Sequence, residues 1–173
     1  MSIEIRRMTL EDITAVQEVA RITWAHTYEG IIPSHIQEQF LNAAYSPAAL
    51  QRRLENDIFL LAVQHGHVVG FADFAEIRTG GVELAAIYIL PEAQGKGIGT
   101  RLLRAGIEAL GSRPSLRVVV ERDNRAARLF YEARGFQLIR EYSEIVFGHS
   151  FSLVEMRLAL EGADSGQSHT GRI

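Results

Sequence analysis

Cysteine is absent from the 173 residues of the sequence, and proline occurs four times. Without cysteine there can be no disulfide, no thiolate metal site and no cysteine nucleophile. No stretch approaches the roughly 20 apolar residues that a membrane-spanning helix needs. The N-terminus alternates apolar and polar residues and lacks the hydrophobic region of a signal peptide. We therefore expect a cytoplasmic protein without a membrane partner.

An excess of positive charge is also missing. The net charge is −3, whereas nucleic-acid binding usually needs a concentrated basic surface, so no nucleic-acid partner is expected. Hydrophobic residues make up 47% and charged residues 23% of the chain, which is the balance of a globular protein. The length fits one domain with a substantial core. We assign this domain to residues 1–160 and expect residues 161–173 to form a flexible tail.

Hydrophobic periodicity and turn residues predict a mixed α/β domain without internal repeats or linkers. Strands are expected at 3–6, 58–63, 68–75, 82–90, 116–120, 136–142 and 151–160. A first helix runs to about residue 26, further short helices begin near residues 34 and 47, and later helices span 98–110 and about 124–134. We write the order as β-αα-βββ-α-β-α-ββ.

The segment 87–100, IYILPEAQGKGIGT, places three glycines between a buried strand and a helix. The start of a helix offers backbone N–H groups and a positive dipole end, and glycines let a phosphate approach closely. Lys96 adds positive charge. The GxGxG spacing and Thr100 differ from the dinucleotide fingerprint, which disfavours a nicotinamide-dinucleotide enzyme. A glycine-rich turn without a ligand remains the alternative.

Two motifs resemble the hallmarks of the GNAT acetyltransferase superfamily. Residues 94–99, QGKGIG, resemble its Q/R-x-x-G-x-G/A signature, and residues 124–136 resemble its second motif, with Asn124, an Ala-rich helix, Tyr131 and then Gly135-Phe136. The resemblance covers residues 1–160. It implies the GNAT fold, with helices on both faces of a mostly antiparallel twisted sheet of about seven strands. It also implies an acyltransferase that moves the acetyl group of acetyl-CoA directly to a primary amine.

The resemblance further implies how acetyl-CoA, the co-substrate, is held. Main-chain groups of residues 87–89 should pair with the pantetheine arm as an added strand, and N–H groups of residues 95–100 should hold the diphosphate. Asn124 should contact pantetheine, and Tyr131, two helical turns away on the same face, should lie near the thioester sulfur. The expected cofactor-binding residues are Ile87, Tyr88, Ile89, Gln94, Gly95, Lys96, Gly97, Ile98, Gly99, Thr100, Asn124 and Tyr131.

Glu83 is the candidate general base. Lysine-like amines have a pKa near 10.4, so a base must remove a proton before attack. Glu83 precedes Ile87 by four residues, which places both side chains on one face of the strand. It is the ionisable residue of an apolar strand, where desolvation would raise its pKa. The alternative for Glu83 is an exposed carboxylate at the end of a strand. Glu121 is the rival base, and its alternative is a solvated ion pair with Arg122.

Tyr131 is the candidate general acid for the departing thiolate, with a packed aromatic beside Phe130 as the alternative. A catalytically silent acyl-CoA-binding module would keep the phosphate loop and lose the base and the acid. Since Glu83 and Tyr131 are both present, the sequence favours the enzyme.

The acceptor and the oligomeric state are less constrained. Four residues lie where the family builds its acceptor site, and they are equally compatible with core or surface positions: Trp24, His26, Tyr28 and Glu29. A small-molecule or peptide amine is expected, and the resemblance suggests a homodimer. His65 and His67 flank a hairpin glycine with no third ligand nearby, so no metal site is expected.

Overall fold

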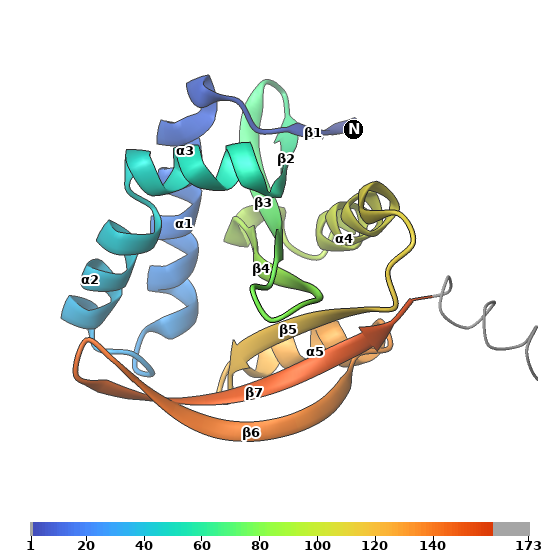
Figure 1. Ribbon diagram of the computed structural model, residues 1–173. Helices are drawn as coiled ribbons and strands as arrows, with labels where there is room; N and C mark the ends of the chain where they lie inside the picture. Colours follow the sequence, from blue (N-terminus) through green and yellow to red (C-terminus); the bar gives the residue numbers. More distant parts are fainter. Residues whose placement is uncertain (1, 161–173) are drawn as a thin grey trace, which may run out of the picture. The chain divides into compact units, whose positions relative to one another are not determined.

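The computed structural model describes residues 2–160, and the tail predicted at 161–173 lies outside them. The described residues form seven strands and five α-helices, labelled in Figure 1. In chain order these are β1 Ile3–Arg7, α1 Ile13–Tyr28, α2 Ser34–Ala44, α3 Pro47–Asn56, β2 Ile58–Gln64, β3 His67–Glu76, β4 Val82–Ile89, α4 Ile98–Leu110, β5 Ser115–Glu121, α5 Arg125–Ala133, β6 Gln137–Val146 and β7 His149–Ala159. None of these helices is both long and apolar enough to cross a membrane.

The predicted order is confirmed, and the helices expected from about residues 34 and 47 are α2 and α3, so three helices precede β2 where the written order β-αα-βββ shows two. Ser46 separates α2 from α3, because its hydroxyl accepts a hydrogen bond from the Ala49 N–H at 3.1 Å and Pro47 begins a new helix. The last two strands run longer than predicted. They meet at Phe147 and Gly148, which both have positive φ and close a tight turn.

The sheet has the strand order β1-β2-β3-β4-β5-β7-β6. β4 and β5 pair in parallel, whereas the β1–β2, β2–β3, β5–β7 and β6–β7 ladders are antiparallel. The predicted mostly antiparallel sheet of seven strands is therefore confirmed.

The chain divides into two compact units built from interleaved segments. The N-terminal unit comprises Met1–Ala75 and Ala85–Ala109, and the C-terminal unit comprises Glu76–Leu84 and Leu110–Ile173. Since each unit draws on two stretches of chain, no single linker separates them. The assignment of residues 1–160 to one domain stays a prediction.

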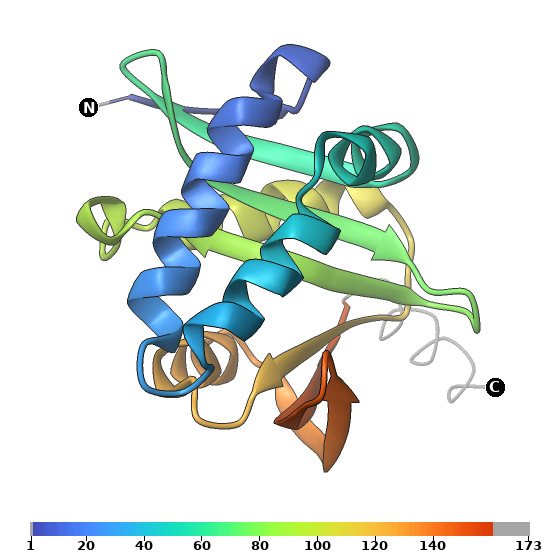
Figure 2. The same cartoon turned by 90° about the vertical axis from the view of Figure 1, so that its left-hand side faces the viewer.

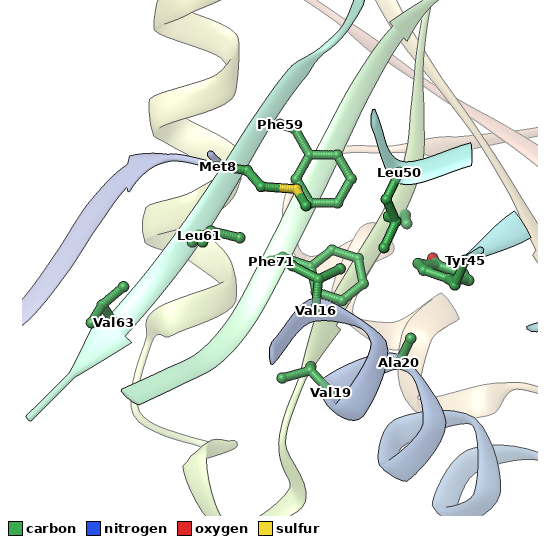
Figure 3. Packing of buried hydrophobic residues seen from close by; sticks show 11 residues of the cluster. Met8, Val16, Val19, Ala20, Tyr45, Leu50, Phe59, Leu61, Val63 and Phe71 are labelled. Carbon is green, nitrogen blue, oxygen red and sulfur yellow. The ribbon is translucent and has the colours of Figure 1, made fainter. Parts of the chain in front are cut away.

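In the N-terminal unit, helices cover both faces of the strands. Figure 2 shows α1, α2 and α3 in front of the strands and α4 behind them. The core below α1 and α3 gathers Val16, Leu50, Phe59 and Phe71, drawn in Figure 3. On the other face, α4 packs directly on β3 at Gly106. Any β-carbon at this position would collide with the ring of Phe74, so only glycine allows this close contact.

A buried ion pair ties α3 to β3. The Arg53 guanidinium donates to Asp73 at 2.8 Å and to the Ala44 carbonyl at 2.8 Å, and it lies over the Tyr45 ring at 4.6 Å. The Asp73 side chain is 1% exposed. Arg53 therefore connects the end of α2, the middle of α3 and the sheet.

Replacing Arg53 with methionine is expected to destabilise the protein by about 1–3 kcal/mol, because it removes the hydrogen bonds to the buried Asp73 side chain and the Ala44 carbonyl, and burial already raises the pKa of Asp73 to about 8. Urea unfolding at neutral pH measures this change in the free energy of unfolding. Arg52→Met is the matched control, since Arg52 is exposed and surface substitutions usually stay within about 0.5 kcal/mol. Equal losses for the two variants would contradict this account of the pair.

In the C-terminal unit, the end of α5 lies against β7. Tyr131 on α5 lies 5.3 Å from the Phe136 ring, and Gly135, with a φ of +96°, brings the chain against Leu158. β6 and β7 form the long hairpin at the bottom of Figure 1. Among the described strands β6 pairs with β7 alone, so its other side is an edge of the sheet.

Candidate active site

The later part of β4 is left as a strand edge. Among the described residues, the ladder between β4 and β5 consists of the pairs Val82–Leu116, Glu83–Arg117 and Leu84–Val118. Residues 85–89 belong to the N-terminal unit, where β3 lies beside them and the Leu90 N–H donates to the Val69 carbonyl at 2.9 Å. The main-chain groups of residues 85–89 that point away from β3 are those that an added strand would use.

A close approach of β3 fixes this edge. A β-carbon at Gly70 would lie 2.9 Å from the Tyr88 carbonyl oxygen and 2.6 Å from Ile89 Cδ1. Glycine is therefore required at this position of β3. The contact holds the main chain of residues 88 and 89 in place.

The turn after β4 presents its main chain to solvent. Gly95 and Gly97 have φ values of +76° and +79°, and a β-carbon added at either would meet nothing within 4 Å. The Gln94 side-chain amide donates to the Ile89 carbonyl at 3.0 Å, which closes the turn onto β4. Lys96 between the glycines is exposed. The helix α4 begins at Ile98, as predicted.

This turn has the properties of an anion site. Left-handed glycines orient successive N–H groups outward, and the first turn of α4 adds the positive end of a 13-residue helix. The open space beside Gly95 and Gly97 and the cation of Lys96 fit a diphosphate. β4, the turn and α4 together thus provide a strand edge and a phosphate cradle within the N-terminal unit.

Glu83 lies in a network of charges in the C-terminal unit. Its carboxylate is 3.5 Å from the Arg117 Nε, and Arg117 Nε is 3.8 Å from Glu155. Glu155 accepts hydrogen bonds from Arg140 and Arg157, each at 3.1 Å. Among the described residues, Arg117 Nε makes no hydrogen bond, so its attraction to Glu83 is electrostatic.

The surroundings of Glu83 raise its pKa. Burial is the largest cause, the positive charge of Arg117 opposes it, and the negative charge of Glu155 adds to it. The Glu83 side chain is 30% exposed, so it is neither sealed in the core nor a fully solvated strand-end carboxylate. A carboxylate in such surroundings is a better proton acceptor than an exposed one.

Glu121, the rival base, has a local structural role. It is buried at the end of β5, and its carboxylate accepts from the Asp123 N–H at 3.4 Å in the turn that leads to α5. The ion pair suggested with Arg122 is absent from the described contacts, in which Arg122 instead lies 3.4 Å from Asp123.

The helix α5 carries Asn124 and Tyr131, which lie two turns apart as the spacing predicts. Asn124 caps the helix, because its side-chain oxygen accepts from the Ala127 N–H at 3.2 Å. Tyr131 is buried, with its ring 5.5 Å from Phe130 and 5.3 Å from Phe136. Like Glu83, both residues belong to the C-terminal unit, whereas residues 87–100 belong to the N-terminal unit.

The predicted acceptor residues differ in exposure. Trp24 and Tyr28 are buried in the N-terminal unit, whereas His26 and Glu29 are exposed. The Trp24 Nε1 donates to the Tyr88 hydroxyl at 2.9 Å, and its ring stacks on Phe40 at 4.4 Å. His65 and His67 are exposed at the β2–β3 turn, and no group of three metal-ligating side chains occurs in residues 2–160.

Comparison with known proteins decides the family. The model of the acetyltransferase (GNAT) family matches residues 17–136. The chain is 32% identical over 146 residues to the spermidine N(1)-acetyltransferase of Thermoplasma acidophilum, which covers 80% of this chain and 90% of that protein. The chain belongs to the GNAT family of acetyltransferases.

Other GNAT proteins show the same similarity. The uncharacterized N-acetyltransferase YuaI of Bacillus subtilis is 34% identical over 112 residues, which cover 62% of this chain and 64% of that protein. The crystal structure of the PaiA N-acetyltransferase from Thermoplasma acidophilum, in complex with coenzyme A, has a TM-score of 0.79 and 29% identity over 92% of this chain and all of that one.

As a GNAT protein, the chain is an acetyl-CoA-dependent N-acetyltransferase, as its two motifs predicted. The sequence did not predict the hydrogen bond to the Tyr88 hydroxyl, although a tyrosine within an aliphatic strand was a signal for it. It also did not predict the charges around Glu83, because Arg117 and Glu155 are distant from Glu83 along the chain.

Proposed function

We propose that this GNAT enzyme acetylates a primary amine of a small polyamine-like molecule. The observation that carries the proposal is the similarity to a spermidine N(1)-acetyltransferase over 90% of that protein's length. A small amine also suits the net charge of −3, since polyamines are cationic. A peptide amine is the other class that the sequence predicted.

An amine panel tests the proposal. Thiol release from acetyl-CoA would be measured with spermidine, spermine, putrescine, an aminoglycoside and a short peptide with a free N-terminus. We expect the highest kcat/KM for a polyamine. A preference for the peptide would overturn the acceptor class, and no turnover with any amine despite retained acetyl-CoA binding would indicate the catalytically silent module.

Acetyl-CoA is held, in this proposal, by the edge of β4 and the turn before α4. Main-chain groups of residues 87–89 pair with the pantetheine arm. N–H groups of residues 95–100 receive the diphosphate, Lys96 adds its charge, and Asn124 contacts pantetheine from α5. The open left-handed glycines of the turn support this arrangement.

Glu83 acts as the general base, directly or through a water molecule. It accepts the proton that the amine loses, the amine nitrogen forms a bond to the thioester carbonyl carbon, and the carbon–sulfur bond then breaks. The Tyr131 hydroxyl donates a proton or a hydrogen bond to the sulfur of the departing thiolate. The raised pKa of Glu83 supports its role as the base, and its cause is burial.

Replacing Tyr131 with phenylalanine removes the proposed acid and keeps the packing against Phe130 and Phe136. We expect kcat to fall at least about 10-fold while the Kd for acetyl-CoA changes little, because the hydroxyl acts on charge that develops during the reaction. Steady-state kinetics and calorimetric titration measure the two quantities. Parallel loss of both would contradict the acid role.

Replacing Arg117 with glutamine removes the cation that lowers the pKa of Glu83. The base is active only when deprotonated, so activity falls as pH falls through its pKa. A further rise in that pKa should therefore move the acidic limb of kcat/KM to higher pH. Arg113→Gln is the control, since Arg113 pairs with Glu76 in the same unit. An unmoved limb in the Arg117 variant would argue against Glu83 as the base.

The proposal also includes a cytoplasmic location and one domain over residues 1–160, which are inferred from sequence composition and length. It further includes a homodimer, which is inferred from the family resemblance.

A further inference from the structure

Charged residues from four strands of the C-terminal unit meet on one face of the sheet. The strand register places Glu83 opposite Arg117, and Arg117 opposite Arg157. Arg140 on β6 lies opposite Glu155, which is two residues before Arg157 on β7 and therefore points to the same face. Side chains directly across neighbouring strands are close enough to interact. Two carboxylates and three guanidinium groups thus form a row across β4, β5, β7 and β6.

Glu155 is the most enclosed side chain of this row, with 6% of it exposed. Its Oε1 accepts a hydrogen bond from Arg140 Nε and its Oε2 accepts one from Arg157, each at 3.1 Å. Burial alone would raise the pKa of Glu155, but the hydrogen bond from Arg140 and the charges of Arg117 and Arg140 outweigh it, so this pKa is lowered. Glu155 therefore stays ionised over the pH range in which Glu83 titrates.

Arg117 is shared between the two carboxylates. Its Nε lies 3.5 Å from Glu83 Oε1 and 3.8 Å from Glu155 Oε1. This Nε is buried and makes no hydrogen bond within residues 2–160. A buried N–H without an acceptor is costly, so the guanidinium would gain by moving fully onto one carboxylate. The similar distances indicate that the attraction of Glu155 balances that of Glu83.

A full hydrogen bond from Arg117 would make Glu83 a poorer base. A carboxylate that accepts from a guanidinium is stabilised in its charged form, so its pKa falls and it takes up a proton less readily. The same bond would also occupy the carboxylate oxygen that has to receive the proton. With Arg117 held between the carboxylates, Glu83 keeps the pKa that burial raises.

We infer that Glu155 is a positioning residue of the active site: by holding Arg117 between the two carboxylates, it keeps Glu83 out of a hydrogen-bonded ion pair and available to accept the proton of the amine. This inference rests on the proposed role of Glu83 as the general base. Glu155 itself contacts neither substrate, and it acts through Arg117.

Carbon-13 NMR of the glutamate carboxyl groups tests the positioning role without reference to turnover. The Glu83 signal is identified by its absence in Glu83→Gln, and its pH dependence gives the pKa of Glu83 in the full chain. Glu155→Gln should lower this pKa, because Arg117 can then close on Glu83 and a neighbouring negative charge is gone. Glu155→Asp keeps the charge and should restore most of the parent value. Glu141→Gln, the matched control, removes the same charge at an exposed position of β6 and should leave the pKa unchanged.

Substitution of Arg117 shows whether the effect of Glu155 passes through it. In Arg117→Gln the lowering caused by Glu155→Gln should be smaller, since only the direct repulsion between the two carboxylates is left to lose. Because a lower pKa keeps the base deprotonated further into acid, Glu155→Gln should move the acidic limb of kcat/KM to lower pH, opposite to Arg117→Gln. The two substitutions should depart from multiplicative effects on kcat/KM by at least about 2-fold, as residues of one ion-pair network do.

A second variant keeps the test decisive if Glu155→Gln does not fold, which circular dichroism would show. Arg140 is 54% exposed, and Arg140→Gln releases Glu155 Oε1 to accept from Arg117. Arg117 should then move away from Glu83, so the pKa of Glu83 should rise.

The outcomes separate this inference from the base assignment. An unchanged or raised pKa of Glu83 in Glu155→Gln, an equal lowering with and without Arg117, or a lowered pKa in Arg140→Gln would overturn the positioning role and leave Glu83 as the base. An acidic limb that persists in Glu83→Gln would overturn the base assignment and, with it, the part of Glu155 in catalysis.

Discussion

Replacing Gly97 with aspartate is expected to weaken acetyl-CoA binding by at least about 100-fold, or about 2.7 kcal/mol. Gly97 has a φ of +79° in the turn before α4, and a side chain there would stand where we place the diphosphate. A carboxylate would repel the phosphates, and its side chain would fill the open space beside the turn. Calorimetric titration with acetyl-CoA measures the change.

Two controls separate the causes of this loss. Gly97→Asn has nearly the same shape without the charge, and asparagine tolerates a left-handed backbone, so its smaller loss would report the electrostatic part. Gly66→Asp introduces the same residue at a φ of +78° in the β2–β3 turn and should leave binding unchanged. Retained affinity in Gly97→Asp would remove the phosphate assignment.

Lys96 provides a direct probe of the same turn. It is the one lysine of the sequence, and it is exposed. An amine-reactive reagent should therefore modify Lys96 and the N-terminus, and bound acetyl-CoA should protect Lys96 selectively. Peptide mass spectrometry would follow both sites, with the N-terminus as an internal control.

Replacing Glu83 with glutamine is expected to lower kcat/KM for the amine by roughly 10²–10⁴-fold, the usual contribution of a positioned general base. Glutamine has nearly the same size but accepts no proton. The acidic limb of the pH–rate profile should also disappear. Because burial raises the pKa of Glu83, that limb in the parent enzyme should lie at higher pH than an exposed glutamate would give.

Control variants distinguish a specific loss from a general one. Glu76→Gln changes a surface glutamate of the same unit, paired with Arg113, and should leave the profile intact. Glu121→Gln should affect folding more than the pH profile, because Glu121 is buried in the turn before α5. If the limb vanished in Glu121→Gln and persisted in Glu83→Gln, the two assignments would have to be exchanged.

Most element positions follow from local sequence, and the exceptions have local causes. Gly95, Gly97 and Gly135 adopt positive φ where the turns were expected. The later strands were predicted too short, because β6 is exposed on both faces and carries charges that break the alternation of a half-buried strand.

Side-chain pairs between distant elements could not be predicted from the sequence. The ion pair of Arg53 with Asp73 joins a helix to a strand, and nothing in the local pattern of either marks it. The same holds for the hydrogen bond from Trp24 to Tyr88, which joins α1 to β4. Both contacts depend on which faces of distant elements meet. Hydrophobic periodicity predicts which face of an element is buried, but it does not predict which other element packs against that face.

The GNAT motifs, the glycine turn and the candidate base could be read from the sequence alone, because backbone conformation and helix starts are set by residues that are neighbours in the chain. The electrostatic surroundings of Glu83 depend instead on the folded chain. Its pKa depends on desolvation and on Arg117 and Glu155, which β5 and β7 bring close to it. Such charges act through space, so their effect is fixed only when distant strands have paired.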